Sequence, residues 1–177
     1  MVSRRSPAAA GATDGGRPAP LLAVSFRPDA GLLTQTRDFV SSFCATFIED
    51  PDTVFCVAMA VHELLENAIK YSLDGTSQFR IELRSERGNL EIAIRTDNRA
   101  TSDAIGAVRD MIRRIHEAAD PFDFYCSLVS ASARRDDHSG LGLARIRAEA
   151  GLELDSDVIG DQVSIFAHTP IARGSLP

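Results

Sequence analysis

The sequence lacks both a long apolar run and a basic cluster within its body. A membrane-spanning helix needs about 20 consecutive apolar residues, and no stretch of the chain approaches that length. A nucleic-acid-binding surface needs clustered lysine and arginine, whereas 19 basic residues are outnumbered here by 25 acidic ones, for a net charge of −6. From these two absences we expect no membrane-spanning segment and no nucleic-acid partner.

Cysteine is also scarce. Cys44, Cys56 and Cys126 are odd in number and widely spaced, which argues against a disulfide framework and against a zinc site. Each lies among apolar neighbours, so we expect three buried free thiols in a protein of the reducing cytoplasm.

Composition divides the chain into one domain and two tails. Residues 1–20 are rich in Ala, Gly, Pro and Ser and have few large apolar side chains, which is typical of a disordered tail. The length of 177 residues suits a single domain, which we place at 21–170, followed by a C-terminal tail at 171–177.

Apolar periodicity predicts the elements of that domain. Alternating residues indicate strands at 21–26, around 79–83 and 90–94, and at 152–158 and 163–168. Helical spacing indicates helices at 32–48, from a cap at Asp52 or Thr53 to Tyr71, over 102–133 with a break at Asp120-Pro121, and from the glycines at 140–143 to about 150. This order predicts an α+β fold, a two-layer α/β sandwich in which helices cover one face of a mixed, mostly antiparallel sheet.

The strongest chemical signal lies in the second long helix. Glu63 and Asn67 are four residues apart and therefore share a helix face. A carboxylate and a carboxamide on one face can orient a water molecule and ligate Mg²⁺. By spacing alone, the alternative is an ordinary solvated face.

A second signal is the sequence Gly140-Leu141-Gly142-Leu143 at the start of a helix. Glycines in such a position let backbone N–H groups approach an anion, and the helix dipole adds to the attraction. The alternative is a tight turn into the helix without a ligand.

Together these motifs resemble a known family. Glu63-x-x-x-Asn67-Ala-x-Lys70-Tyr71 resembles the N-box of the Bergerat-fold, histidine kinase/gyrase-like ATPases, and the sequence at 140–143 resembles their G2 box. Residues 26–43 resemble the opening of the anti-sigma-factor/serine-kinase branch of partner-switching regulators. The resemblance spans about residues 21–170.

The resemblance implies a role for each matching position. Asn67 would hold Mg²⁺ against the phosphates of ATP, Glu63 would be the general base, and Lys70 would lie near the phosphates. The four residues 140–143 would cradle the phosphates beneath a lid at about 101–139.

The expected G1 box, Asp-x-Gly-x-Gly after the second hairpin strand, is altered. Alternation along the strand turns Thr96 inward, whereas a bulge would turn Asp97 inward instead; both are candidates for adenine recognition. Asn98 and Ala100 stand where the family has glycines.

Three functional hypotheses follow. The resemblance implies a cytoplasmic signalling regulator that binds ATP and Mg²⁺ and phosphorylates a serine or threonine of a STAS-type antagonist, with a sigma factor as a further partner and a homodimer by analogy. The altered G1 box favours the alternative of an inactive adaptor or phosphotransfer-like module. A detached histidine-kinase catalytic domain is the third, which the short chain without a phosphoacceptor hairpin disfavours.

Overall fold

The computed structural model describes residues 21–26, 30–86, 89–133 and 140–171. Residues 1–20 and 172–177 of the expected tails lie outside the described residues, whereas Ile171, the first residue of the expected C-terminal tail, belongs to a strand. The elements are β1 (Leu21–Phe26), α1 (Ala30–Cys44), α2 (Pro51–Tyr71), β2 (Ser77–Glu86), β3 (Asn89–Arg99), α3 (Ser102–Glu117), α4 (Pro121–Ser132), α5 (Leu141–Glu149), β4 (Glu153–Ile159) and β5 (Gln162–Ile171).

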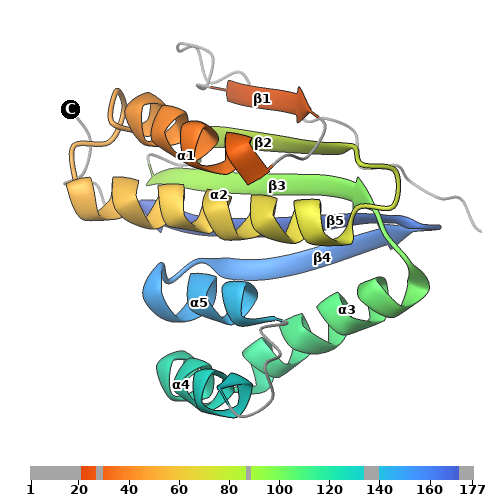
Figure 1. The fold of residues 1–177 in the computed structure, drawn as a ribbon. Coiled ribbons are helices and arrows are strands. Elements are labelled where there is room, and N and C mark those ends of the chain that lie inside the picture. Colours follow the sequence, from red (N-terminus) through yellow and green to blue (C-terminus); the bar gives the residue numbers. More distant parts are fainter. Residues whose placement is uncertain (1–20, 27–29, 87–88, 134–139, 172–177) are drawn as a thin grey trace, which may run out of the picture.

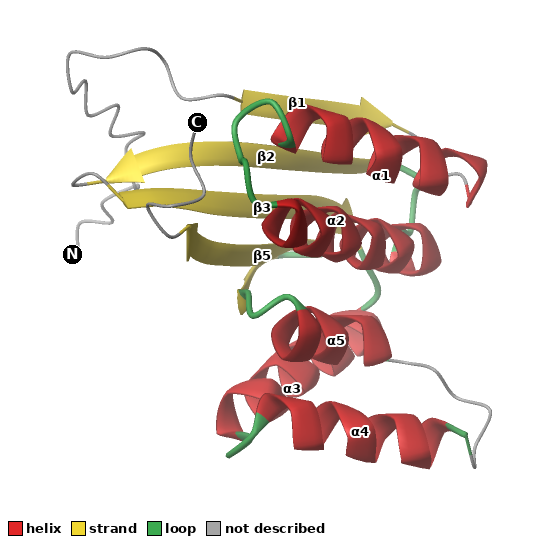
Figure 2. Cartoon of the chain, turned by 90° about the vertical axis from the view of Figure 1, so that its left-hand side faces the viewer, coloured by secondary structure: helices red, strands yellow, loops and turns green. Residues whose placement is uncertain are grey.

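The five strands form one sheet in the order β1-β2-β3-β5-β4. Helices cover one of its faces, and Figures 1 and 2 show the two layers from perpendicular directions. The two-layer α+β sandwich is therefore confirmed. All four described strand pairs are antiparallel rather than mixed, because β2 and β5 lie between β1, β3 and β4, the three strands that run in the opposite direction.

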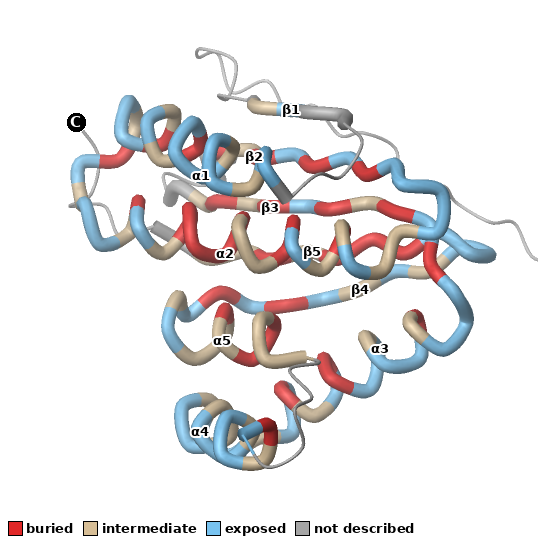
Figure 3. Tube along the Cα trace, in the orientation of Figure 1, coloured by how far each residue is buried: buried red, intermediate tan, exposed pale blue. Residues whose placement is uncertain are grey.

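Helix α2 crosses the middle of the sheet and supplies much of the core. The apolar stripe expected from its periodicity is buried along its whole length, as Figure 3 shows for the side of α2 that faces the strands. Leu64 is fully buried, and it belongs to the same core cluster as the inward residues Phe79 and Ile94 of β2 and β3. An amphipathic helix on a half-buried sheet gains its stability from this contact.

The start of α2 differs from the expected cap at Asp52 or Thr53. The helix begins at Pro51, and the side chain of Asp50 accepts a hydrogen bond of 3.0 Å from the backbone N–H of Thr53. Proline suits the first helical position because its fixed φ is already helical and no N–H is needed there. The preceding helix α1 ends at Cys44, four residues before the expected Ile48, in a turn at 45–47.

The outer helices α3 and α4 occupy the region expected to form a lid. They are capped by Thr101 and Asp120, and Pro121 opens α4, as the expected break at Asp120-Pro121 requires. Helix α4 packs mainly against α5 and lies farthest from the sheet (Figure 1). Ser132 is the only residue buried in it.

The cysteines are not all buried as expected. Cys44 is buried, and its burial raises the pKa of the thiol to about 11. Cys56 is partly exposed and Cys126 is exposed, because Cys126 lies on the outer helix α4. Within the described ranges, no helix combines the length and the apolarity that crossing a membrane requires.

The cap of α2 predicts a pH-dependent contribution to stability. Hydrogen bonds from the Thr53 side chain and backbone lower the pKa of Asp50. A carboxyl group with a lowered pKa in the folded state stabilises the fold above its unfolded pKa, and that stabilisation is lost as the pH falls through the folded pKa. Asp50→Ala should therefore be less stable than wild type at neutral pH, and the two should converge in acid.

Urea unfolding from about pH 7 to about pH 2 measures this convergence. Asp52→Ala, in the same turn, is the matched control and should show a smaller loss at neutral pH. A difference between Asp50→Ala and wild type that is constant over the whole range would contradict the capping role.

Candidate functional site

The structure brings the two sequence motifs together. Glu63 of α2 lies directly beneath Gly142 of α5, so that a Cβ atom added to Gly142 would lie 2.5 Å from Oε2 of Glu63. Any side chain at position 142 would require this carboxylate to shift from its present position. The helix face that carries Glu63 and the glycine-rich sequence therefore lie together in the fold, although they are far apart along the chain.

Arg145 is a site residue that the sequence motifs did not indicate. Its Nη1 donates to Oε1 of Glu63 at 3.0 Å, and its Nε donates to Oε2 of Glu149 at 2.8 Å. The hydrogen bonds that Arg145 donates to Glu149 and to Glu63 raise its pKa further above the ordinary value. Glu63 thus lies in an ion pair through Oε1, and its side chain is largely buried.

A cavity of about 240 Å³ opens beside this contact, between α2, α3 and the start of α5. Nδ2 of Asn67 is buried at its wall and has no hydrogen-bond partner among the described residues. Buried donors without partners are rare because the lost hydrogen bond with water is not replaced. The cavity is lined by Asn67, Tyr71, Ala104, Ala107, Val108, Asp110, Met111, Arg114, Gly140 and Leu143.

The turn into α5 has the conformation that its first glycine permits. Gly140 has a φ of +81° in the left-handed region, and it caps α5 without a side-chain hydrogen bond to the first helical amides. The side chain of Met111 on α3 packs against Gly140 so closely that a Cβ atom added there would displace its Cε atom. Of the other residues of this sequence, Leu143 also lines the cavity, Gly142 contacts Glu63, and Leu141 is partly buried.

Lys70 is not part of the cavity wall. Its side chain is exposed near the end of α2, and Nζ lies 5.2 Å from the centre of the Tyr71 ring. The cavity wall therefore does not include the lysine that the resemblance places near the phosphates.

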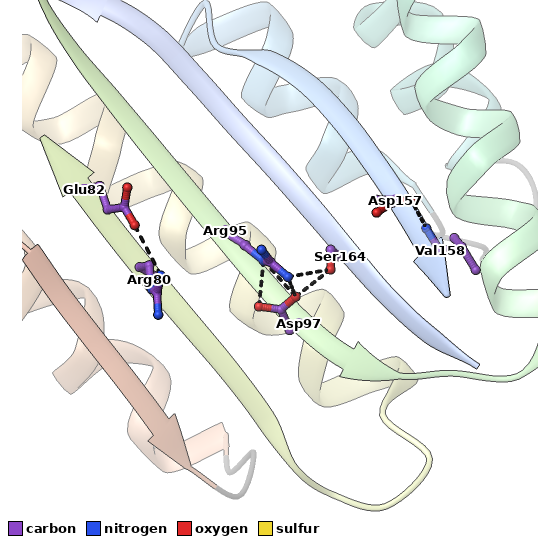
Figure 4. A network of polar contacts seen from close by, with 7 residues as sticks. All are labelled: Arg80, Glu82, Arg95, Asp97, Asp157, Val158 and Ser164. Carbon is purple, nitrogen blue, oxygen red and sulfur yellow. Dashed lines mark hydrogen bonds and ion pairs between the residues drawn. The ribbon is translucent and has the colours of Figure 1, made fainter. Parts of the chain in front are cut away.

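The two candidates for adenine recognition lie on opposite faces of the sheet. Thr96 points inward, is 1% exposed, and has a hydroxyl without a partner in the described structure. Asp97 points to the helix-free face, where it accepts hydrogen bonds from Arg95 at 2.8 Å and from Ser164 at 2.5 Å (Figure 4). Because β3 pairs regularly from Asn89 to Arg99, the bulge that would turn Asp97 inward is absent.

Ser77 adds a second inward hydroxyl that sequence reasoning missed. It is buried, its Oγ has no partner among the described residues, and it pairs with Asn98 one inward position beyond the pair of Phe79 with Thr96. Extending the alternation of β2 backwards from Phe79 would have identified it, because Ser77 is the next inward position.

The described residues contain no cluster of three or more His, Cys, Asp or Glu side chains that could hold a metal ion. A magnesium ion at Asn67 would therefore need most of its oxygen ligands from phosphates and water, as is usual for Mg²⁺ bound with a nucleotide.

Comparisons with known proteins support the fold. No protein-family model and no curated protein matches the chain. Among solved structures, a chain in the crystal structure of the SiaB–SiaC complex from Pseudomonas aeruginosa is similar, with a TM-score of 0.59 and 15% sequence identity. The match covers 85% of this chain and 88% of that chain, so nearly the whole architecture is shared.

The contact between Gly142 and Glu63 predicts that the same substitution affects stability differently in two helices. Gly106→Ala in α3 meets no atom within 4 Å and should stabilise the protein by about 0.5–1 kcal/mol, as alanine does inside helices. Gly142→Ala should lack this gain or destabilise, because Glu63 must move. Urea unfolding of both variants tests this; equal stabilisation would show that the contact imposes no constraint.

Proposed function

We propose that this protein is a nucleotide-binding signalling regulator of the partner-switching type, with the site for ATP and Mg²⁺ at the cavity between α2, α3 and α5. The observation that carries the proposal is the unpartnered buried Nδ2 of Asn67, in the same cavity wall as the left-handed turn at Gly140. A phosphate group offers acceptors both to this amide and to the free backbone N–H groups at the start of α5.

The residues present fit the phosphate part of ATP better than the base. For adenine, we propose the inward hydroxyls of Thr96 and Ser77, which are buried, have no described partners and lie outside the present cavity wall. Asp97 is not included, because its carboxylate faces the other side of the sheet and bonds to Arg95. We infer that base recognition is weaker than in a site with an inward carboxylate.

Binding also requires movement of the lid. The cavity of about 240 Å³ is smaller than the roughly 300–1,000 Å³ of typical ligand pockets. Met111 fills space against Gly140, so we propose that α3 withdraws from the glycine turn when nucleotide enters.

The proposed activity is transfer of the γ-phosphoryl group of ATP to a serine or threonine of a STAS-type antagonist in the cytoplasm. Glu63 is the proposed base for the substrate hydroxyl; its Oε1 pairs with Arg145, so Oε2 would accept the proton. The similar solved structure is a complex of two proteins, which supports a protein partner here. A sigma factor and a second copy of the chain remain further proposed partners.

The second candidate is an adaptor without catalysis. It is favoured by the Glu63–Arg145 ion pair and by the small cavity closed by Met111. In that case the same fold would bind a partner protein, and nucleotide would have no effect on the interaction.

Nucleotide binding is tested by calorimetric titration of the full chain with ATP in Mg²⁺. Asn67→Ala should weaken binding by about tenfold to a hundredfold, the effect of losing a hydrogen bond to a charged group. Glu66→Ala is the matched control, since Glu66 is exposed on the same helix. Absence of binding to wild type would reject the nucleotide site and leave the adaptor.

Catalysis is tested by transfer of label from γ-labelled ATP to a purified STAS-type protein. Glu63→Gln keeps the size of the side chain and should lower transfer by about 10²–10⁴-fold, the usual effect of a general base, without weakening ATP binding. Glu66→Gln should transfer normally. Normal transfer by Glu63→Gln would exclude Glu63 as the base.

A further inference from the structure

The cavity contains an arginine that belongs to neither sequence motif. Arg114 on α3 is partly buried and lines the cavity together with Asn67 and Gly140. Its guanidinium carbon lies 5.3 Å from the centre of the Phe124 ring on α4. This cation–π contact holds the side chain between the two lid helices without neutralising its charge.

The acids closest in sequence do not neutralise Arg114 either. Asp110 and Glu117 lie four residues before and three residues after it, at the spacing of helical ion pairs. Both bond instead to Arg113: Glu117 accepts at 3.0 and 2.8 Å, and Asp110 accepts from the other terminal nitrogen. No carboxylate of the described residues pairs with Arg114.

Two groups of this cavity wall therefore lack an anion or an acceptor as partner: the guanidinium of Arg114 and the side-chain amide of Asn67. Arg114 supplies five N–H groups in a planar fork, and the Asn67 amide supplies another without a described partner. Asp110 lines the same wall, but Arg113 binds its carboxylate. A partly buried, unpaired charge is costly until an anion joins it, and a phosphate chain has the acceptor oxygens that match a guanidinium fork.

We propose that Arg114, rather than Lys70, binds the phosphate chain of the nucleotide and makes affinity depend on the number of phosphates. This inference rests on the proposed nucleotide site. It also gives α3 a role in recognition: Arg114 contributes a positive charge to the cavity wall, and the ion pairs of Arg113 with Asp110 and Glu117 leave that charge without a carboxylate partner.

The experiment compares Arg114→Gln with Arg109→Gln by calorimetry of the full chain in Mg²⁺. Arg109 is exposed on the same helix and does not line the cavity, so both variants lose one charge from α3. The probes are ATP, adenosine and inorganic tripolyphosphate. Arg114→Gln should weaken ATP and tripolyphosphate by about tenfold or more and leave adenosine unchanged, whereas Arg109→Gln should change none of them.

A third variant tests the arrangement of charges. Arg113→Gln releases Asp110 and Glu117, which can then pair with Arg114. ATP binding should weaken although Arg113 itself is outside the cavity wall, and adenosine binding should again be unchanged. Unaltered ATP affinity in Arg113→Gln would contradict the idea that Arg113 keeps Arg114 available.

The outcomes separate this inference from the proposed function. If wild type binds ATP and Arg114→Gln binds it equally well, Arg114 has no such role and the nucleotide site stands. An equal loss of ATP and adenosine binding would also overturn the inference, because the defect would then be structural. Arg114-dependent binding of tripolyphosphate without adenosine or ATP would support Arg114 and reject the nucleotide function. Binding of none of the probes would reject both.

Discussion

The approach of α5 to α2 depends on the missing side chain of Gly142. Without a side chain at Gly142, α5 lies so close to α2 that Glu63 occupies the space that a Cβ atom would need. Arg145 can then reach the same carboxylate at 3.0 Å. This contact sets the position of the turn at Gly140, and the turn in turn forms one wall of the cavity that Asn67 and α3 complete. Stability and the candidate site therefore share one constraint.

Features that depend on local periodicity could be predicted from the sequence. The buried stripe of α2, the inward position of Thr96 and the break before α4 all follow from side-chain spacing or from proline. The family resemblance implied that the helix face of Glu63 and the glycine turn act together, and the structure places Glu63 against Gly142; their role in binding a nucleotide stays a prediction. Exposure of Cys126 was not foreseen, since an apolar sequence context does not reveal that α4 lies outermost.

Contacts between distant segments could not be read from spacing. Arg145 follows the glycine turn by only a few residues, yet its partner Glu63 lies on another helix, and no local pattern joins them. Arg114 was missed for a related reason, because its significance lies in acids that bind its neighbour Arg113. The orientation of Asp97 also depends on distant segments. The pairing of β3 with β2 and β5 shows that β3 has no bulge, and Asp97 therefore faces the same side of the sheet as Arg95.

Helix α4 is attached to the molecule chiefly through α5, and it presents Phe122 and Val129 to the exterior. Helix α5 begins at the glycine turn. A shift of that turn would therefore move α5 and, with it, the outer helix α4. The two helices would then move together, because α4 packs mainly against α5. The exposed face of α4 would then change its position when the cavity is filled, although it lies far from the cavity.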